Sequence, residues 1–116
     1  MTQQDYESYR QAACSYFDCA HIMLTEDERN HVEVADFGLA DLPHIGLQLV
    51  IYVNTNRVCA KEMVLLPGQV CPEHRHPAFD DYAGKEETFR CRYGKVFLYV
   101  AGSATEKPAI QPPQNG

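Results

Sequence analysis

Residues 68–94 read GQVCPEHRHPAFDDYAGKEETFRCRYG, and this stretch decides which fold the chain can adopt. One residue separates His74 from His76, so in an extended segment both imidazoles point to the same face. Glu87 begins the next predicted strand and shares its parity with Phe89, which places the carboxylate on the inward, apolar side. A buried carboxylate needs a partner or a cation, so two inward histidines and one inward glutamate predict a divalent-metal site. Such a site leaves open coordination positions and suits Mn, Fe, Zn, Co or Ni as a Lewis acid.

On the N-terminal side of this stretch, the sequence predicts one helix and several strands. Residues 3–20 place aromatic and alanine side chains at steps of three and four, which is typical of an amphipathic helix packed on a sheet. Residues 25–30 form a charged connector, and residues 54–56 (NTN) favour a hairpin turn. Alternating or β-branched apolar residues predict strands in three segments: 31–39, 45–53 and 57–66.

On the C-terminal side, two further strands, EETFRCRY and KVFLYVAG, are expected around Gly94. Residues 103–116 carry three prolines and form a Pro-rich tail or a truncated connection. One helix followed by about six strands predicts an all-β, mainly antiparallel sandwich or barrel, in a single domain over residues 1–102.

Composition restricts the classes of function. A chain of 116 residues fits one domain, and a formal charge of −6 with ten Lys plus Arg argues against a nucleic-acid partner. The sequence contains no apolar run of the roughly 20 residues needed to cross a bilayer, and no basic leader followed by an apolar stretch. Five cysteines, none in a C-x-x-C pair, predict reduced thiols in a cytoplasmic protein. Three other histidines are interpreted as structural: His21, His31 and His44.

The spacing in residues 68–94 resembles the first motif of the cupin superfamily: a glycine, five residues, H-x-H, a glutamate, six residues and a second glycine. It departs from that motif because ten residues, rather than three or four, separate His76 from Glu87. The run HRHPAFDDYAGKEETFRCRYGKVFLYV, with AKEMVLLPGQV before it, resembles the D-lyxose isomerase family of cupin-fold sugar isomerases. The resemblance extends more weakly to the N-terminal helix and implies a cupin jelly-roll sandwich or barrel.

The resemblance also implies roles for particular residues. In that family the two histidines and the glutamate bind a divalent metal, usually Mn, so His74, His76 and Glu87 are the expected ligands. Family members carry a lysine thirteen positions before the first ligand histidine, where this chain has Lys61. Lys61 shares its parity with the apolar residues Cys59, Met63 and Leu65, so it is expected to point inward and to serve either catalysis or a structural ion pair.

The function implied is a ketol-isomerase that converts D-lyxose into D-xylulose, with D-mannose to D-fructose as a second candidate reaction. An enediol route needs a base, a proton donor and charge stabilisation at two oxygens. Lys61 would hold or protonate one oxygen. Glu86 has the parity opposite to Glu87 and is expected to be solvated, so the base is left unassigned. Arg90 and Arg92 are interpreted as a solvated or intersubunit strand face.

Two alternatives to an active isomerase follow from what the sequence lacks. Cupins take a further histidine ligand from a second motif downstream, and no histidine follows Gly94 here. The sequence therefore predicts the N-terminal portion of a longer isomerase. The alternatives are a non-catalytic metal- or sugar-binding cupin module and an inactive remnant. Open strand edges would favour a homo-oligomer, expected to be a dimer.

Overall fold

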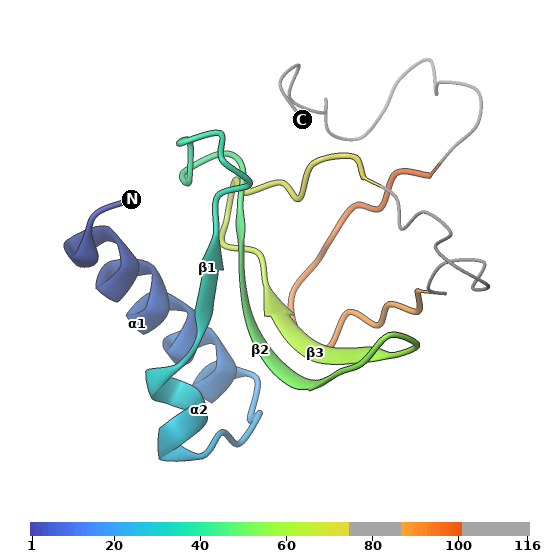
Figure 1. Cartoon of the computed structure of the whole chain (residues 1–116), viewed down its shortest axis with the longest axis horizontal. Helices are drawn as coiled ribbons and strands as arrows, with labels where there is room; N and C mark the ends of the chain where they lie inside the picture. Colours follow the sequence, from blue (N-terminus) through green and yellow to red (C-terminus); the bar gives the residue numbers. More distant parts are fainter. Residues whose placement is uncertain (75–86, 101–116) are drawn as a thin grey trace.

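The predicted N-terminal helix is confirmed as α1 (Gln3–Cys19) in a computed structural model that describes residues 1–74 and 87–100. Thr2 and Asp5 form a capping box at its start, in which each backbone N–H donates to the side chain of the other residue. Figure 1 shows α1 packed beside a twisted sheet. A local cap and the burial of one side therefore fix this helix.

A residue in the left-handed region, His21, follows the end of α1, with φ of +57°. The His21 N–H donates to the Asp18 carbonyl and the Ile22 N–H donates to the Phe17 carbonyl, which is the Schellman pattern. Ile22 then packs against the core. His21 thus occupies a structural position that glycine would adopt with less strain.

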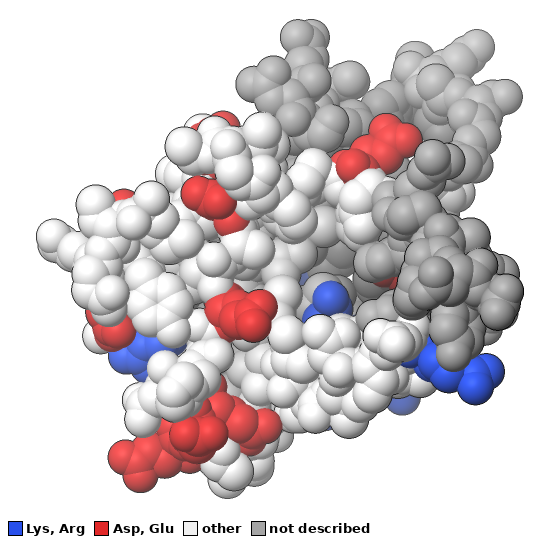
Figure 2. Space-filling view, viewed as in Figure 1, with Lys and Arg blue, Asp and Glu red and all other residues white. Residues whose placement is uncertain are grey.

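Residues 25–30, expected to be a connector, contain a second helix instead, α2 (Glu26–Asn30). Thr25 and Glu28 form another capping box, with N···O distances of 3.1 and 2.8 Å. The acidic residues of its first turn lie where the helix dipole favours negative charge. The connector prediction was wrong because it overlooked the capping signature T-x-x-E. Acidic side chains gather over α2 on the molecular surface (Figure 2).

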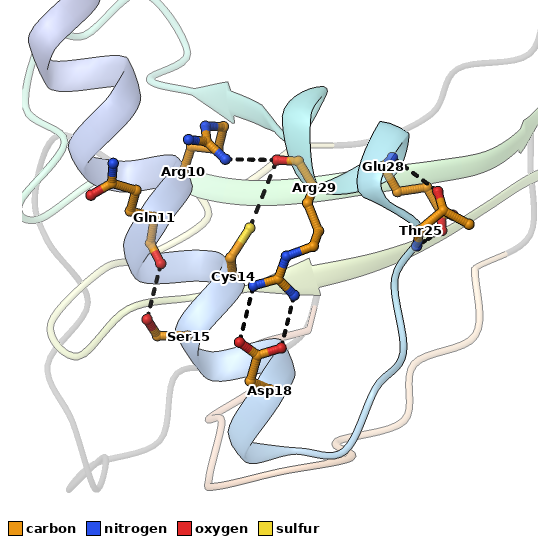
Figure 3. A network of polar contacts seen from close by, with 8 residues as sticks. All are labelled: Arg10, Gln11, Cys14, Ser15, Asp18, Thr25, Glu28 and Arg29. Atoms are coloured by element: carbon orange, nitrogen blue, oxygen red, sulfur yellow. Dashed lines mark hydrogen bonds and ion pairs between the residues drawn. The ribbon is translucent and has the colours of Figure 1, made fainter.

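Arg29 joins α2 to α1 (Figure 3). Its guanidinium donates to both carboxylate oxygens of Asp18, at 2.8 and 3.0 Å, and thereby lowers the pKa of that carboxyl. Its backbone carbonyl accepts from Arg10 Nη1 at 2.9 Å and from Cys14 Sγ at 3.8 Å. These polar contacts hold α2 against α1.

The sheet contains three antiparallel strands in the order β1-β2-β3: β1 (Glu33–Ala35), β2 (Leu47–Asn54) and β3 (Cys59–Val64). The predicted hairpin between the second and third strands is confirmed, and in its turn the Thr55 N–H donates to the Val58 carbonyl at 2.8 Å. The β2–β3 register shifts between Ile51 and Val53, so Tyr52 is an extra residue in β2.

The two faces of this sheet have different neighbours. Val50 and Val64 pack with Phe17 in the core beneath α1. Glu62 lies opposite Val50 in the β2–β3 register and therefore belongs to the helix side. Lys61, one residue earlier, belongs to the other side. The alternation predicted for this strand is thus confirmed, and it separates Lys61 from the helical core.

Two buried amides lock the chain leaving β3 onto the start of β2. Gln48 is fully buried and Gln69 is 8% exposed. Gln48 Nε2 donates to the Val64 carbonyl at 3.0 Å and to Gln69 Oε1 at 2.8 Å. Gln69 Nε2 donates to the Leu42 carbonyl at 2.8 Å and to Gln48 Oε1 at 3.1 Å. This network fixes the segment that leads to His74.

The described residues contain three strands rather than about six. The segment predicted over residues 31–39 contributes only β1, because the chain bends where Phe37 takes a φ of +55°. Residues 87–100 form no strand; they are exposed and turn at Gly94, whose φ is +79°. Their alternating pattern suits a strand, but a strand also needs a neighbour to pair with.

The mainly antiparallel sheet and its preceding helix agree with the predicted fold class, but the sheet is unclosed and a jelly roll is not confirmed. The predicted domain boundary after residue 102 and the tail over residues 103–116 lie outside the described residues. Within residues 1–74 and 87–100, no helix is both long and apolar enough to cross a membrane.

Candidate metal-binding and catalytic site

A backbone contact orients the first predicted ligand, His74. Its Nδ1 lies 2.9 Å from the Pro72 carbonyl oxygen, and because a carbonyl can only accept, Nδ1 carries the proton. In neutral His74 the lone pair is then on Nε2. Metal-binding histidines commonly have their other ring nitrogen held in this way. His74 is therefore set to offer Nε2 as a ligand.

Glu87, the second predicted ligand in the described part, lies beside that nitrogen. Glu87 Oε1 is 4.0 Å from His74 Nε2, and both side chains are less than half exposed, at 41% and 44%. Ligand bonds to a divalent cation are about 2.0–2.2 Å long. Ligand atoms on one such ion are about 3.0 Å apart at 90° and about 3.4 Å apart at the tetrahedral angle, so these two groups are neighbours that would have to move closer to share a divalent ion.

Cys71 connects these groups with Lys61. Its Sγ lies 3.9 Å from His74 Nδ1. Burial raises the pKa of the Cys71 thiol, the Glu87 carboxylate raises it further, and the Lys61 ammonium lowers it. Both charges therefore act on the same sulfur. Three separate segments of the sequence thus bring Lys61, Cys71, His74 and Glu87 to one region of the molecule.

Two expectations about the surroundings of these residues were wrong. Lys61 was expected to point inward, but its side chain is exposed, on the face of β3 opposite to the helical core. Glu87 was expected on an inward apolar face, whereas it and Phe89 are both exposed. The reason is that residues 87–100 form no ladder that would hold one of their faces against the sheet.

One expected ligand, His76, lies outside the described residues, and so does Glu86, which was expected to be solvated. In the described part of the chain, no group of three His, Cys, Asp or Glu side chains is arranged to hold a metal ion. His31 and His44 each contact an aspartate of their own turn, at 3.3 and 2.9 Å, which agrees with structural roles.

Two features of this region were missed from the sequence. Cys71 was predicted only as one of five reduced thiols, although its position three residues before His74 could have indicated a place near the site. Arg92 was interpreted as part of a solvated or intersubunit face, but it donates from Nη1 to Glu62 Oε1. Glu62 follows Lys61 directly, so the alternation that places Lys61 on one face places this ion pair on the other.

The fold and site define an antiparallel sheet protein in which a histidine and a carboxylate lie 4.0 Å apart beside the sheet. No family model matches the chain. Curated relatives, however, are similar to nearly all of it. The chain is 62% identical over 95 residues to D-lyxose/D-mannose isomerase of Thermosediminibacter oceani, a match that covers 82% of this chain and 52% of the relative.

Two further relatives are each named D-lyxose ketol-isomerase. The protein of a Thermofilum species is 46% identical over 114 residues, covering 98% of this chain, and that of Cohnella laeviribosi is 52% identical over 114 residues, covering 97%. The chain spans 63% of the length of both. The predicted resemblance to the D-lyxose isomerase family is confirmed, and the chain is a homologue of about half to two-thirds of these proteins.

Proposed function

We propose that this chain carries the metal-binding part of an aldose–ketose isomerase of the D-lyxose isomerase type. The observation that carries the proposal is the 46–62% identity to proteins named D-lyxose isomerases. The substrate would be D-lyxose, converted into D-xylulose, with D-mannose to D-fructose as a second reaction. A small sugar is then the partner, and neither nucleic acid nor a membrane is required.

His74, His76 and Glu87 would hold the divalent ion, which we take to be Mn. The orientation of His74 Nε2 and its 4.0 Å separation from Glu87 Oε1 support two of these assignments. When bound, the ion would supply Lewis-acid polarisation of the sugar oxygens.

Lys61 would act as the catalytic donor. An ammonium group can hold a developing enediolate oxygen and return a proton to it, as isomerisation through an enediol requires. Its charge acts on the same thiol as that of Glu87, which supports its presence at the site. Its exposure leaves the Lys61 amine accessible to a sugar.

We also propose the complete fold, the oligomeric state and the cellular location. The antiparallel β1-β2-β3 sheet would be part of a cupin jelly roll, and its open strand edges would be covered in a homodimer. Reduced cysteines, all free in the described structure, are compatible with a cytoplasmic location.

The test is D-xylulose formation from D-lyxose by the 116-residue chain with Mn²⁺, performed in D₂O. Proton transfer through an enediol predicts deuterium at C1 of the ketose. Lys61→Met should lower kcat by about 100-fold while Mn²⁺ affinity is kept, and His74→Ala should abolish Mn²⁺ binding. The exposed Lys95 provides a control, and Lys95→Met should behave as wild type.

The outcomes separate the alternatives. Mn²⁺ binding without turnover would contradict isomerisation by this chain and favour the non-catalytic binding module. Turnover without deuterium incorporation would contradict the enediol route. If Mn²⁺, Zn²⁺ and Co²⁺ all fail to bind, the metal site itself is wrong.

A further inference from the structure

The ion pair between Arg92 and Glu62 is partly shielded from water. The Glu62 side chain is only 16% exposed, against 50% for Arg92. Tyr52 lies nearby: burial raises the pKa of its phenol most, the Glu62 and Glu28 carboxylates raise it further, and Arg92 lowers it. Tyr52 therefore lies close to both members of the pair. Shielding strengthens the attraction relative to that of a fully solvated pair.

The position of the pair relates it to the candidate site. Glu62 and Lys61 are consecutive in β3 and project from opposite faces. Arg92 lies five residues after Glu87 in the same segment. The pair therefore fastens the segment that carries Glu87 to the strand that carries Lys61, on the face opposite to the site.

Side-chain contacts matter here because residues 87–100 form no strand with the sheet. A segment without ladder hydrogen bonds keeps its place through the contacts of its side chains. Glu87 approaches His74 at one end of this segment, and Arg92 reaches Glu62 further along it. Release of the second contact would let the Glu87 carboxylate move away from the imidazole.

We propose that Arg92 is a positioning residue that holds Glu87 at the metal site through its ion pair with Glu62. The inference rests on the proposed function, because it assumes that Glu87 is a metal ligand. It assigns Arg92 no contact with the sugar or the ion. Loss of the Arg92 side chain would therefore lower the metal affinity even though every ligand is still present.

The experiment measures Mn²⁺ affinity by calorimetric titration of the full chain. Arg92→Ala and Glu62→Gln should each weaken Mn²⁺ binding about tenfold. Their combination should be no weaker than either alone, because both remove the same contact. Arg92→Lys should restore most of the affinity. Arg90→Ala is the matched control on the same exposed segment and should bind as wild type.

The thermal unfolding midpoint of each metal-free variant is measured alongside. A purely structural role predicts a lower midpoint with unchanged Mn²⁺ affinity, and that result would overturn the inference. Wild-type affinity in Arg92→Ala, with binding abolished in His74→Ala, would also overturn it and leave the proposed metal site standing. Failure of the wild-type chain to bind Mn²⁺ would overturn both.

Discussion

The helix–sheet layer and the site segments of this chain are held in different ways. The layer buries Ala13, Phe17 and Val32 to 1% exposure or less, and its buried glutamines are hydrogen-bonded to each other. In contrast, every residue of the described segment 87–100 is exposed. The layer is stabilised by burial of apolar surface, whereas the arrangement of the site segments depends on a few polar contacts.

This difference predicts that substitutions in the two regions will have different effects. Substitutions in the layer should lower the free energy of unfolding, because they remove buried contacts. Substitutions in the site segments should leave that energy almost unchanged and alter the chemistry of the site instead.

The same residue type occurs in both regions, at Phe17 and Phe97. Phe17 is 1% exposed, so Phe17→Ala should lower the free energy of unfolding by about 3–5 kcal/mol. Phe97 is 41% exposed, and Phe97→Ala should cost less than about 1 kcal/mol. Urea denaturation of both variants gives the comparison. Equal losses would mean that the two regions share one core.

The buried amide pair should have the next largest effect. Gln48→Met removes three hydrogen bonds: one to the Val64 carbonyl and two that Gln48 exchanges with Gln69. A cost of about 1–3 kcal/mol in unfolding free energy is expected. Gln11→Met, on the exposed side of α1, is the control and should change stability by less than about 0.5 kcal/mol. A neutral Gln48→Met would show that the pair does not fix the chain after β3.

Local patterns in the sequence were sufficient for the layer but not for the site. The 3.6-residue period predicted α1, and the NTN turn predicted the hairpin between β2 and β3. Each of these signals acts over a few residues. The capping box of α2 is also a local signal, but its T-x-x-E signature lies within a run of charged residues that is equally typical of a connector.

The remaining features depend on contacts between distant segments. The Gln48–Gln69 pair and the Arg92–Glu62 pair join residues 21 and 30 positions apart, and no periodicity reveals which polar side chains meet. Residues 87–100 alternate as a strand would, but pairing is a property of two segments and the pattern describes only one. The types of the site residues could therefore be predicted better than their burial.

A substitution at the end of α1 should increase stability, by less than the losses expected for Phe17→Ala. His21 takes a φ of +57°, and glycine adopts this conformation without the steric cost of a Cβ. His21→Gly should raise the free energy of unfolding by about 0.5–1 kcal/mol. His31 has a φ of −120° at the end of α2, so His31→Gly should bring no such gain. Destabilisation by His21→Gly would mean that its side chain contributes more than its backbone position.

The last prediction concerns the pKa of the Cys71 thiol, which can be followed in the metal-free protein. Only the thiolate reacts with iodoacetamide, and burial together with the Glu87 carboxylate raises the pKa of Cys71. Glu87→Gln removes a negative charge, so the pKa should fall and the curve of alkylation rate against pH should move to lower pH. Lys61→Met removes a positive charge, so the same curve should move to higher pH.

Peptide mass spectrometry over a time course measures these rates, and the exposed Cys19 in the same samples is the internal control that neither variant should affect. Glu87 and Lys61 belong to different segments, so opposite shifts at one sulfur require that both lie close to it in solution. A Cys71 profile that is unchanged in both variants would break the link between the strand that carries Lys61 and the segment that carries Glu87. Because no metal or sugar takes part, the result separates the assembly of the site from its activity.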